Sequence, residues 1–243
     1  AEQLQIDQLE IIERNRVHEG QELKILGAIG EGKAPTSVPS AASCALEEIL
    51  RQGREMIQWS SPKPQNGDWH IGRGVAIIMQ KSGIPDIDQA NCMIKLESDG
   101  TFIVHSGGAD IGTGLDTVVT KLAAEVLHCP PQDVHVISGD TDHALFDKGA
   151  YASSGTCFSG NAARLAAENL REKILFHGAQ ILGEPVADVQ LATPGVVRGK
   201  KGEVSFGEIA HKGETGTGFG SLVGTGSYIT PDFAFPYGAN FAE

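Results

Sequence analysis

Residues 101 to 136 read TFIVHSGGADIGTGLDTVVTKLAAEVLHCPPQDVHV, and the order of patterns in this stretch decides the fold. It starts with a β-branched run at 101–105, breaks at a glycine loop at 107–114, and continues at 115–127 with the spacing of an amphipathic helix. Two prolines end the helical pattern, and a second apolar run follows at 134–137. The order strand, loop, helix, strand predicts a right-handed crossover between two parallel strands. The expected fold class is therefore α/β, with mixed α and β elements.

The glycine loop at 107–114 would lie at the carboxyl end of the first strand, where ligands of α/β sheets usually bind. Glycines let a ligand approach the backbone, and the free N–H groups of the first helical turn attract an anion. The loop lacks both the Gly-Lys-Ser/Thr ending of a Walker A motif and the Gly-x-Gly-x-x-Gly dinucleotide fingerprint. These residues alone allow two interpretations: the loop is an anion-binding site, or it is only a turn that connects the strand to the helix.

Composition excludes several classes of protein. The 243 residues are 40% hydrophobic and 21% charged, which is enough for a buried core in one large or two modest domains. A formal net charge of -12 without runs of Lys or Arg argues against nucleic acid or an anionic membrane as partner. No apolar run approaches the roughly 20 residues that span a bilayer, and no signal peptide is visible, so we expect a cytoplasmic protein. The four cysteines are scattered, and we expect reduced, buried thiols.

Other elements follow from hydrophobic periodicity and from helix and turn signals. The expected helices are 1–17, a helix capped by Ser40 or Ser43 that runs to about 58, 159–182, and a single turn at 206–211. The expected strands are a buried strand at 69–80, a hairpin of 92–97 with 101–105, short edge strands within 185–206, and a strand that starts at 237. In the first helix, Leu4, Leu9 and Ile12 should face inward. The segment 213–226 carries six glycines and is expected to be flexible.

No catalytic or metal-binding set stands out. The eight histidines show no ligand spacing, and His105 and His135 are expected to be core residues of strands. Asp140, Asp142 and Asp147 do not match a calcium loop and are interpreted as turn and cap residues. The small residues at 150–156 precede a helix, where they permit either tight packing or approach by a ligand. Spacing alone thus favours a binding module over a complete enzyme, with no catalytic residue and no metal ligand assigned.

Five blocks in register nevertheless resemble the molybdenum-cofactor-binding subunit of the xanthine dehydrogenase and aldehyde oxidase family of molybdenum hydroxylases. The blocks are GGADIGTGLDT at 107–117, AAEVL at 123–127, GDTD at 139–142, YASSGTCFSGNA at 151–162 and YGANFAE at 237–243. Residues 9–20 are similar to the helix that precedes the second cofactor-binding domain of the family. The resemblance implies the fold of a molybdopterin-binding domain of this type.

The resemblance also implies a cofactor and the residues that hold it. The cofactor would be a molybdenum-pterin, either molybdopterin or its cytosine dinucleotide. The residues that would bind it are Ile111, Gly112, Thr113 and Gly114 on one side and Ala152, Ser153 and Gly155 on the other. Many family members have Gln at the position of Thr113, where its amide reaches a molybdenum oxygen, and the shorter Thr leaves that contact to another group.

Activity and partners are likewise implied by the resemblance. Residues 1–19 would be a helix that continues from an upstream domain, and 20–243 a cofactor-binding domain that is incomplete at its C-terminus. The reaction would be hydroxylation of a purine, another N-heterocycle or an aldehyde, with water as the oxygen source. The family's substrate-loop arginine lies upstream of these residues and its catalytic Glu downstream, so we expect a fragment that is inactive alone.

The expected partners are the upstream half of the molybdenum subunit, iron-sulfur and FAD modules on other domains or subunits, and a small-molecule substrate. Two alternatives remain at this stage. One is a noncatalytic binding or scaffold domain that has kept the fold. The other is an unrelated phosphate-ligand enzyme that uses the loop at 107–117.

Overall fold

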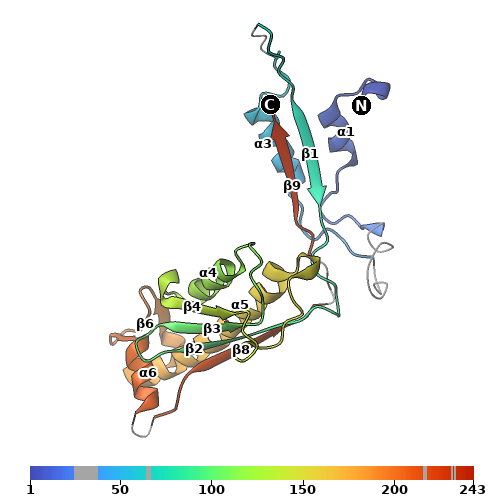
Figure 1. The fold of residues 1–243 in the computed structure, drawn as a ribbon. Coiled ribbons are helices and arrows are strands. Elements are labelled where there is room, and N and C mark those ends of the chain that lie inside the picture. The colour runs from blue at the N-terminus through green and yellow to red at the C-terminus, as the bar shows by residue number, and fades with distance from the viewer. Residues whose placement is uncertain (25–37, 64–66, 216–217, 231, 233) are drawn as a thin grey trace. The chain divides into compact units, whose positions relative to one another are not determined.

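The computed structural model describes residues 1–24, 38–63, 67–215, 218–230, 232 and 234–243, and it has the mixed α and β composition expected from the sequence (Figure 1). The chain divides into two compact units. Unit 1 comprises Ala1–Ser82 and Asp232–Glu243, and unit 2 comprises Gly83–Pro231. Over the described residues, no helix combines the length and apolar character needed to cross a membrane.

Unit 1 is built on a two-stranded antiparallel ribbon. Strand β1 (Gly74–Met79) pairs with strand β9 (Tyr237–Ala242), so that Gly74 lies opposite Ala242. Helices α1 (Gln8–Asn15) and α3 (Leu46–Met56) contribute Leu9 and Leu50 to a small core with Val75. Gly53 lets the Phe241 ring lie against α3, because a Cβ at this position would be 2.0 Å from that ring.

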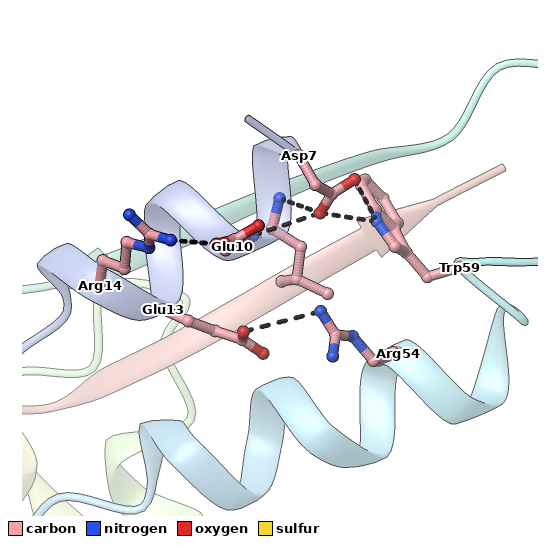
Figure 2. Close-up of polar contacts among 7 residues, drawn as sticks. Asp7, Glu10, Glu13, Arg14, Arg54 and Trp59 are labelled. Atoms are coloured by element: carbon pink, nitrogen blue, oxygen red, sulfur yellow. Dashed lines mark hydrogen bonds and ion pairs between the residues drawn. The ribbon is translucent and has the colours of Figure 1, made fainter. Parts of the chain in front are cut away.

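Polar contacts tie α1 to the segment that follows α3 (Figure 2). The Asp7 carboxylate accepts the N–H groups of Leu9 and Glu10 at 2.9 and 3.2 Å and thereby caps α1. The Trp59 Nε1–H group donates to both oxygens of the same carboxylate, at 3.2 and 3.1 Å. Arg54 on α3 lies 3.6 Å from Glu13 on α1. The two helices are therefore linked by charge as well as by apolar packing.

Arg73 makes hydrogen bonds at the end of the ribbon where β1 begins and β9 ends. Its Nη1 donates to the carbonyls of Gln58 and Ser61 at 2.7 and 2.8 Å, and its Nε donates to Glu243 at 2.5 Å. The Arg73 side chain is only 6% exposed. It therefore joins the turn after α3 to the end of β9.

Unit 2 contains a four-stranded sheet in the order β4-β3-β2-β8. Its strands are β2 (Ala90–Leu96), β3 (Phe102–Ser106), β4 (Val134–Ser138) and β8 (Val223–Tyr228). Strands β3 and β4 are parallel, and helix α4 (Leu115–Leu127) connects them, so the predicted crossover and the predicted β2–β3 hairpin are both confirmed. The long helix α5 (Gly155–Leu182) packs with α4 on the sheet, in one core with the buried residues of β2 and β3.

The remaining elements of unit 2 are short. A separate antiparallel sheet has the order β5-β6-β7, which confirms the short strands expected within 185–206. Its strands are β5 (Gln190–Ala192), β6 (Val196–Arg198) and β7 (Glu203–Ser205), and helix α6 (Phe206–Glu214) follows directly. The 3-10 turns of the described chain are η1 (Glu2–Leu4), η2 (Pro131–Asp133), η3 (Tyr151–Ser153) and η4 (Val186–Asp188).

The first two helices begin and end differently from the prediction. The single helix expected at 1–17 is wrong, because the left-handed Gln5 ends η1 and Asp7 caps a separate α1. Leu4 is 66% exposed and does not face inward, whereas Leu9 is fully buried. Helix α3 starts after Ala45, without a side-chain cap, so neither Ser40 nor Ser43 caps it. Residues 25–37 of the connector between these helices lie outside the described residues.

Strand β1 is shorter and more open than expected. It covers six residues of the range 69–80, and it belongs to a ribbon with a single partner strand. Ile78 is 60% exposed, and Trp69, which precedes the strand, is 77% exposed. The prediction of a buried strand was therefore wrong, since apolar content alone does not distinguish a central strand from a ribbon.

The described parts of the glycine-rich segment 213–226 depart from the prediction of flexibility, while residues 216–217 lie outside the described residues. Gly213 belongs to α6, which is longer than the single turn expected, and the segment ends inside strand β8. A Cβ on Gly224 would lie 2.3 Å from the Ala166 carbonyl, and one on Gly226 would lie 2.3 Å from the Ala162 carbonyl. These glycines therefore allow the backbone of β8 to touch α5, which is a packing role.

Two details of the helices in unit 2 differ as well. Helix α5 begins at Gly155, about one turn before the predicted start at 159. In α4, the fully inward stripe includes Val119 and Ala123, while Val118 and Leu122 are half-buried and lie beside Gly160 of α5. The face of α4 that carries Val118 and Leu122 thus packs against α5, and the adjacent face with Val119 and Ala123 is the fully buried one.

Candidate functional site

Two loops of unit 2 lie side by side, each leading into a helix. The first follows β3 and enters α4, and the second, at η3, enters α5. A Cβ on Gly155 would lie 3.7 Å from Leu115 Cδ1, and a Cβ on Gly108 would lie 2.8 Å from Ser159 Oγ. The starts of the two helices are therefore in contact, as the sequence argument expected.

The glycines of the first loop have two different roles. Gly107 and Gly108 serve packing, since a Cβ on Gly107 would be 2.2 Å from the Leu145 carbonyl. Gly112 and Gly114 have φ values of +98° and +77°, and a Cβ on either would meet nothing within 4 Å. Only the second pair leaves open space in which a ligand could approach the backbone.

Asp110 binds two backbone N–H groups of the glycine loop, just before the first turn of α4. Its Oδ1 accepts the N–H of Gly112 at 2.9 Å and that of Gly114 at 3.1 Å. The hydrogen bond from Gly112 is the main reason why the pKa of the Asp110 carboxyl is lowered, and the bond from Gly114 adds to it. A carboxylate of the chain itself therefore already binds these two N–H groups of the loop, so an external anion would need other donors.

The second loop has an unusual backbone for its residue types. Ala152 and Ser153 have φ values of +50° and +56°, in the left-handed region that side chains other than glycine rarely adopt. The Ala152 carbonyl accepts the N–H of Gly83 at 2.8 Å, and this hydrogen bond holds the loop against the start of unit 2. The Ser154 hydroxyl donates to the carbonyls of Gly149 and Tyr151 and does not cap α5, whose first turn has no side-chain cap.

Asp147 ties the segment before the second loop to helix α5. Its Oδ2 accepts the Ser159 hydroxyl at 2.8 Å, and its Oδ1 accepts the Gly149 N–H at 2.7 Å. Asp140 accepts the N–H of Asp142 at 2.9 Å in the same manner. The interpretation of these aspartates as turn residues is confirmed for Asp140 and Asp147. The described part of the chain contains no group of three His, Cys, Asp or Glu side chains that could hold a metal ion.

Several polar residues near the first loop were missed by the sequence argument. Asp116, in the first turn of α4, accepts the Ser138 hydroxyl at 3.0 Å through Oδ2, while its buried Oδ1 finds no hydrogen-bond partner in the described residues. The buried Nδ1 of His105 likewise finds none there, and its ring lies 6.3 Å from that of His143. The sequence indicated these two residues only by their positions. Asp116 follows the glycine loop, and Ser138 ends the parallel strand β4.

The two strand histidines were predicted wrongly. His105 is only half-buried and its Nδ1 is unsatisfied, so it is not a satisfied core residue. His135 is exposed, on the side of β4 that faces away from the core. The cysteines are free, as expected, but only Cys92 and Cys129 are buried, while Cys44 and Cys157 are half-buried.

The seven residues assigned to the cofactor gather in this pair of loops. They are Ile111, Gly112, Thr113, Gly114, Ala152, Ser153 and Gly155, and all are exposed or half-buried. Ile111 is 68% exposed, so its apolar side chain is available to a ligand. The open glycines, the exposed Ile111 and the uncapped start of α5 fit a ligand with both an apolar ring system and an anionic group.

Known proteins resemble this chain in sequence and in fold. Residues 52–243 match the profile of the family described as a molybdopterin cofactor-binding domain. The chain is 99% identical over 243 residues to a protein of Escherichia coli K12 named "Probable hypoxanthine oxidase XdhD", covering all of this chain and 25% of that protein. It is 35% identical over 178 residues to the "Xanthine dehydrogenase molybdenum-binding subunit" of Escherichia coli O157:H7, covering 70% of this chain and 24% of that protein. The chain thus spans about a quarter of the length of these relatives.

Solved structures share the fold at low sequence identity. Quinoline 2-oxidoreductase from Pseudomonas putida 86 superposes with a TM-score of 0.75 at 20% identity, covering 100% of this chain and 32% of that one. CO dehydrogenase from Oligotropha carboxidovorans gives a TM-score of 0.74 at 18% identity, covering 99% of this chain and 32% of that one. The fold class predicted from the sequence is confirmed by these neighbours. With most of its length matched by the family profile, this chain belongs to the molybdopterin cofactor-binding domain family.

Proposed function

We propose that this chain supplies two cofactor-contacting loops of a molybdenum hydroxylase that oxidises a purine. The observation that carries the proposal is the juxtaposition of loops 111–114 and 152–155 in a chain of the molybdopterin-binding family. Open glycines in the first loop and left-handed backbone in the second give a ligand access to main-chain atoms.

The roles of the individual residues follow from their positions. Gly112 and Gly114 would let the pterin lie against the backbone, and the exposed Ile111 and Thr113 would contact it through their side chains. Gly155 opens α5, whose free N–H groups would donate to an anionic group of the cofactor. When bound, such a cofactor supplies a redox centre that hydroxylates carbon with oxygen from water.

The substrate class rests on the relatives. The 99% identical protein carries a hypoxanthine oxidase name, and the 35% identical one a xanthine dehydrogenase name, so a purine is the first choice over other N-heterocycles and aldehydes. The remaining site groups, the iron-sulfur and FAD modules and the upstream half of the molybdenum subunit would come from outside these residues.

We further propose that residues 1–243 alone do not turn over substrate. A cofactor that loses even three charge-assisted hydrogen bonds of about 1.5 kcal/mol each binds roughly three orders of magnitude more weakly. Absence of the family's general base lowers the rate by a further two to four orders of magnitude, approximately. The chain should therefore retain little cofactor and show no dye reduction.

The test compares this chain with the longer Escherichia coli relative, both produced in a host that assembles the molybdenum cofactor. Molybdenum is measured by elemental analysis, pterin by fluorescence after oxidation, and activity by dye reduction with hypoxanthine, xanthine and an aldehyde panel. The longer protein should contain both molybdenum and pterin and oxidise a purine. A longer protein without molybdenum would favour the noncatalytic scaffold, and turnover by residues 1–243 would contradict the inactivity proposal.

A matched pair of substitutions in the longer protein tests the loop itself. Gly112 and Gly202 both have positive φ and open space around the Cβ position, but Gly202 lies between the short strands β6 and β7. Gly112→Ala and Gly202→Ala each force a side chain into a positive φ angle and should cost about 1 to 3 kcal/mol of backbone strain. Only Gly112→Ala should reduce pterin content, and equal losses from the two variants would remove this loop from the site.

A further inference from the structure

The cofactor loop before α4 is held by one carboxylate oxygen. Asp110 Oδ1 receives two backbone N–H groups, from Gly112 at 2.9 Å and from Gly114 at 3.1 Å. The N-cap position of α4 is Gly114, which has no side chain with which to cap the helix. Asp110, four residues earlier, instead fixes the turn that leads into the helix, because its two donors lie before the first helical residue.

The positive φ angles of the two glycines explain the geometry. At +98° and +77°, the backbone turns the N–H groups of Gly112 and Gly114 toward one point, which forms an anion-binding concavity. In most such concavities the anion comes from a ligand. Here the point is filled by the chain's own Asp110, and the lowered pKa of this carboxyl keeps it ionised at neutral pH.

We propose that Asp110 is the positioning residue of the cofactor loop and acts as a built-in anion. Its oxygen fixes Ile111 and Thr113 in the outward-facing arrangement and closes these two N–H groups to external anions. The loop then contacts the cofactor through exposed side chains and open glycine backbone, and anionic groups of the cofactor bind elsewhere. The part that concerns the cofactor rests on the proposed function, whereas the closure of the N–H groups does not.

Two substitutions separate the acceptor oxygen from its charge. Because both donors meet the same oxygen, Asn at position 110 can keep both hydrogen bonds through its amide oxygen, whereas Ala can keep neither. Asp110→Asn should therefore preserve the loop, and Asp110→Ala should release it. Asp99 provides the control, since its Oδ1 also accepts a backbone N–H two residues later, from Thr101 at 2.9 Å, but in the β2–β3 turn.

The experiment follows the amide signals of Gly112 and Gly114 by NMR in the 243-residue chain, with inorganic phosphate as the probe. In Asp110→Ala, exchange of these amides should accelerate about tenfold, as expected for the loss of a hydrogen bond, and phosphate should shift their signals. The wild-type chain, Asp110→Asn and Asp99→Ala should show slow exchange at both glycines and no response to phosphate. Thermal melting of each variant confirms that it is folded.

Pterin content of the longer relative with the same substitutions gives the second readout. It should fall severalfold in Asp110→Ala and remain unchanged in Asp110→Asn and Asp99→Ala. Unchanged exchange in Asp110→Ala, fast exchange in Asp110→Asn, or a phosphate response in the wild-type chain would each overturn the role of Asp110. If the wild-type protein contains no pterin, the proposed function fails, while the exchange and phosphate measurements still decide whether the Asp110 oxygen holds the loop and closes the two N–H groups.

Discussion

At the scale of single residues, short acidic side chains shape the loops of this protein. Asp7, Asp110 and Asp147 each accept a backbone N–H two residues further along the chain. This local bond fixes a turn without any contribution from the core. The consequence is that the loop conformations depend on the ionisation or acceptor capacity of individual carboxyls.

Asp110 gives a pH-dependent prediction. Hydrogen bonds to the ionised form lower its pKa below the ordinary value of 3.8, so the folded chain holds this proton more weakly than the unfolded chain. The resulting stabilisation is present above pH 3.8 and is lost as the pH falls through the lowered pKa. An NMR titration should show the Gly112 and Gly114 amide signals constant from neutral pH to about pH 4 and moving only below it. Movement centred above pH 4 would contradict the assigned hydrogen bonds.

The cysteines give a second prediction at this scale. Burial raises the pKa of Cys92 to about 12 and that of Cys129 to about 11, so both remain thiols at pH 8. Alkylation of the native chain by iodoacetamide, followed by mass spectrometry of the peptides, should label the half-buried Cys44 before either of them. All four should react equally once the chain is unfolded in urea. Early labelling of Cys92 would show that the sheet core opens readily.

At the scale of elements, the sequence predicted what is encoded locally. The crossover from β3 through α4 to β4 follows from adjacent apolar periods, glycines and prolines, and each is visible within about 35 residues. The two site loops were assigned by resemblance, and their proximity was expected because both precede the first turn of a helix and would flank one cofactor. The hydrogen bonds from backbone N–H groups to Asp110 could not be predicted from the sequence. An aspartate in a glycine loop can equally point its side chain into solvent, and the residue type alone does not distinguish the two conformations.

Long-range pairing was the part that could not be predicted. Strand β8 joins the sheet beside β2, more than a hundred residues away in sequence, and its Gly224 and Gly226 have low strand propensity. The residues that make glycine necessary, Ala162 and Ala166, lie on another element. Tertiary contact therefore overrides local preference in this strand.

The contact between β8 and α5 predicts a clear difference between two strand glycines. Gly224→Ala would place a Cβ 2.3 Å from the Ala166 carbonyl and should destabilise unit 2 by about 3 kcal/mol, because backbone must move. Gly74→Ala, in β1, meets nothing within 4 Å and should change stability by less than about 0.5 kcal/mol. Urea denaturation of both variants provides the measurement. Equal midpoints would show that β8 does not touch α5 so closely.

At the scale of the whole molecule, unit 2 is inserted into unit 1. The chain leaves unit 1 after Ser82 and re-enters it at Asp232. Within unit 2, the Asp86 N–H donates to the Thr230 carbonyl at 3.1 Å, so the two ends of the insert are bonded to each other. Within unit 1, the Ser82 N–H donates to the Ala234 carbonyl at 2.8 Å. Each unit therefore closes on itself where the chain crosses.

This closure predicts that residues 83–231 fold without the rest of the chain. They contain the large core with α4, α5 and the four-stranded sheet, which is the size of a typical domain. The excised segment should unfold cooperatively in urea and retain the slow amide exchange of Gly112 and Gly114. If the excised segment lacks dispersed NMR signals, or unfolds without cooperativity, then unit 2 requires unit 1 in order to fold.

The pairing of Gly74 with Ala242 has a consequence for biosynthesis. On the ribosome, β1 emerges long before β9, the strand with which it pairs, and at the usual rate of translation residues 83–231 take on the order of 10 s to follow. During that interval the nascent β1 presents an unpaired edge, the kind of surface that invites wrong partners and chaperones. Unit 2 can finish folding first and bring its two ends together through the Asp86–Thr230 hydrogen bond. Strand β9, which is translated after unit 2, then emerges close to β1 and can pair with it.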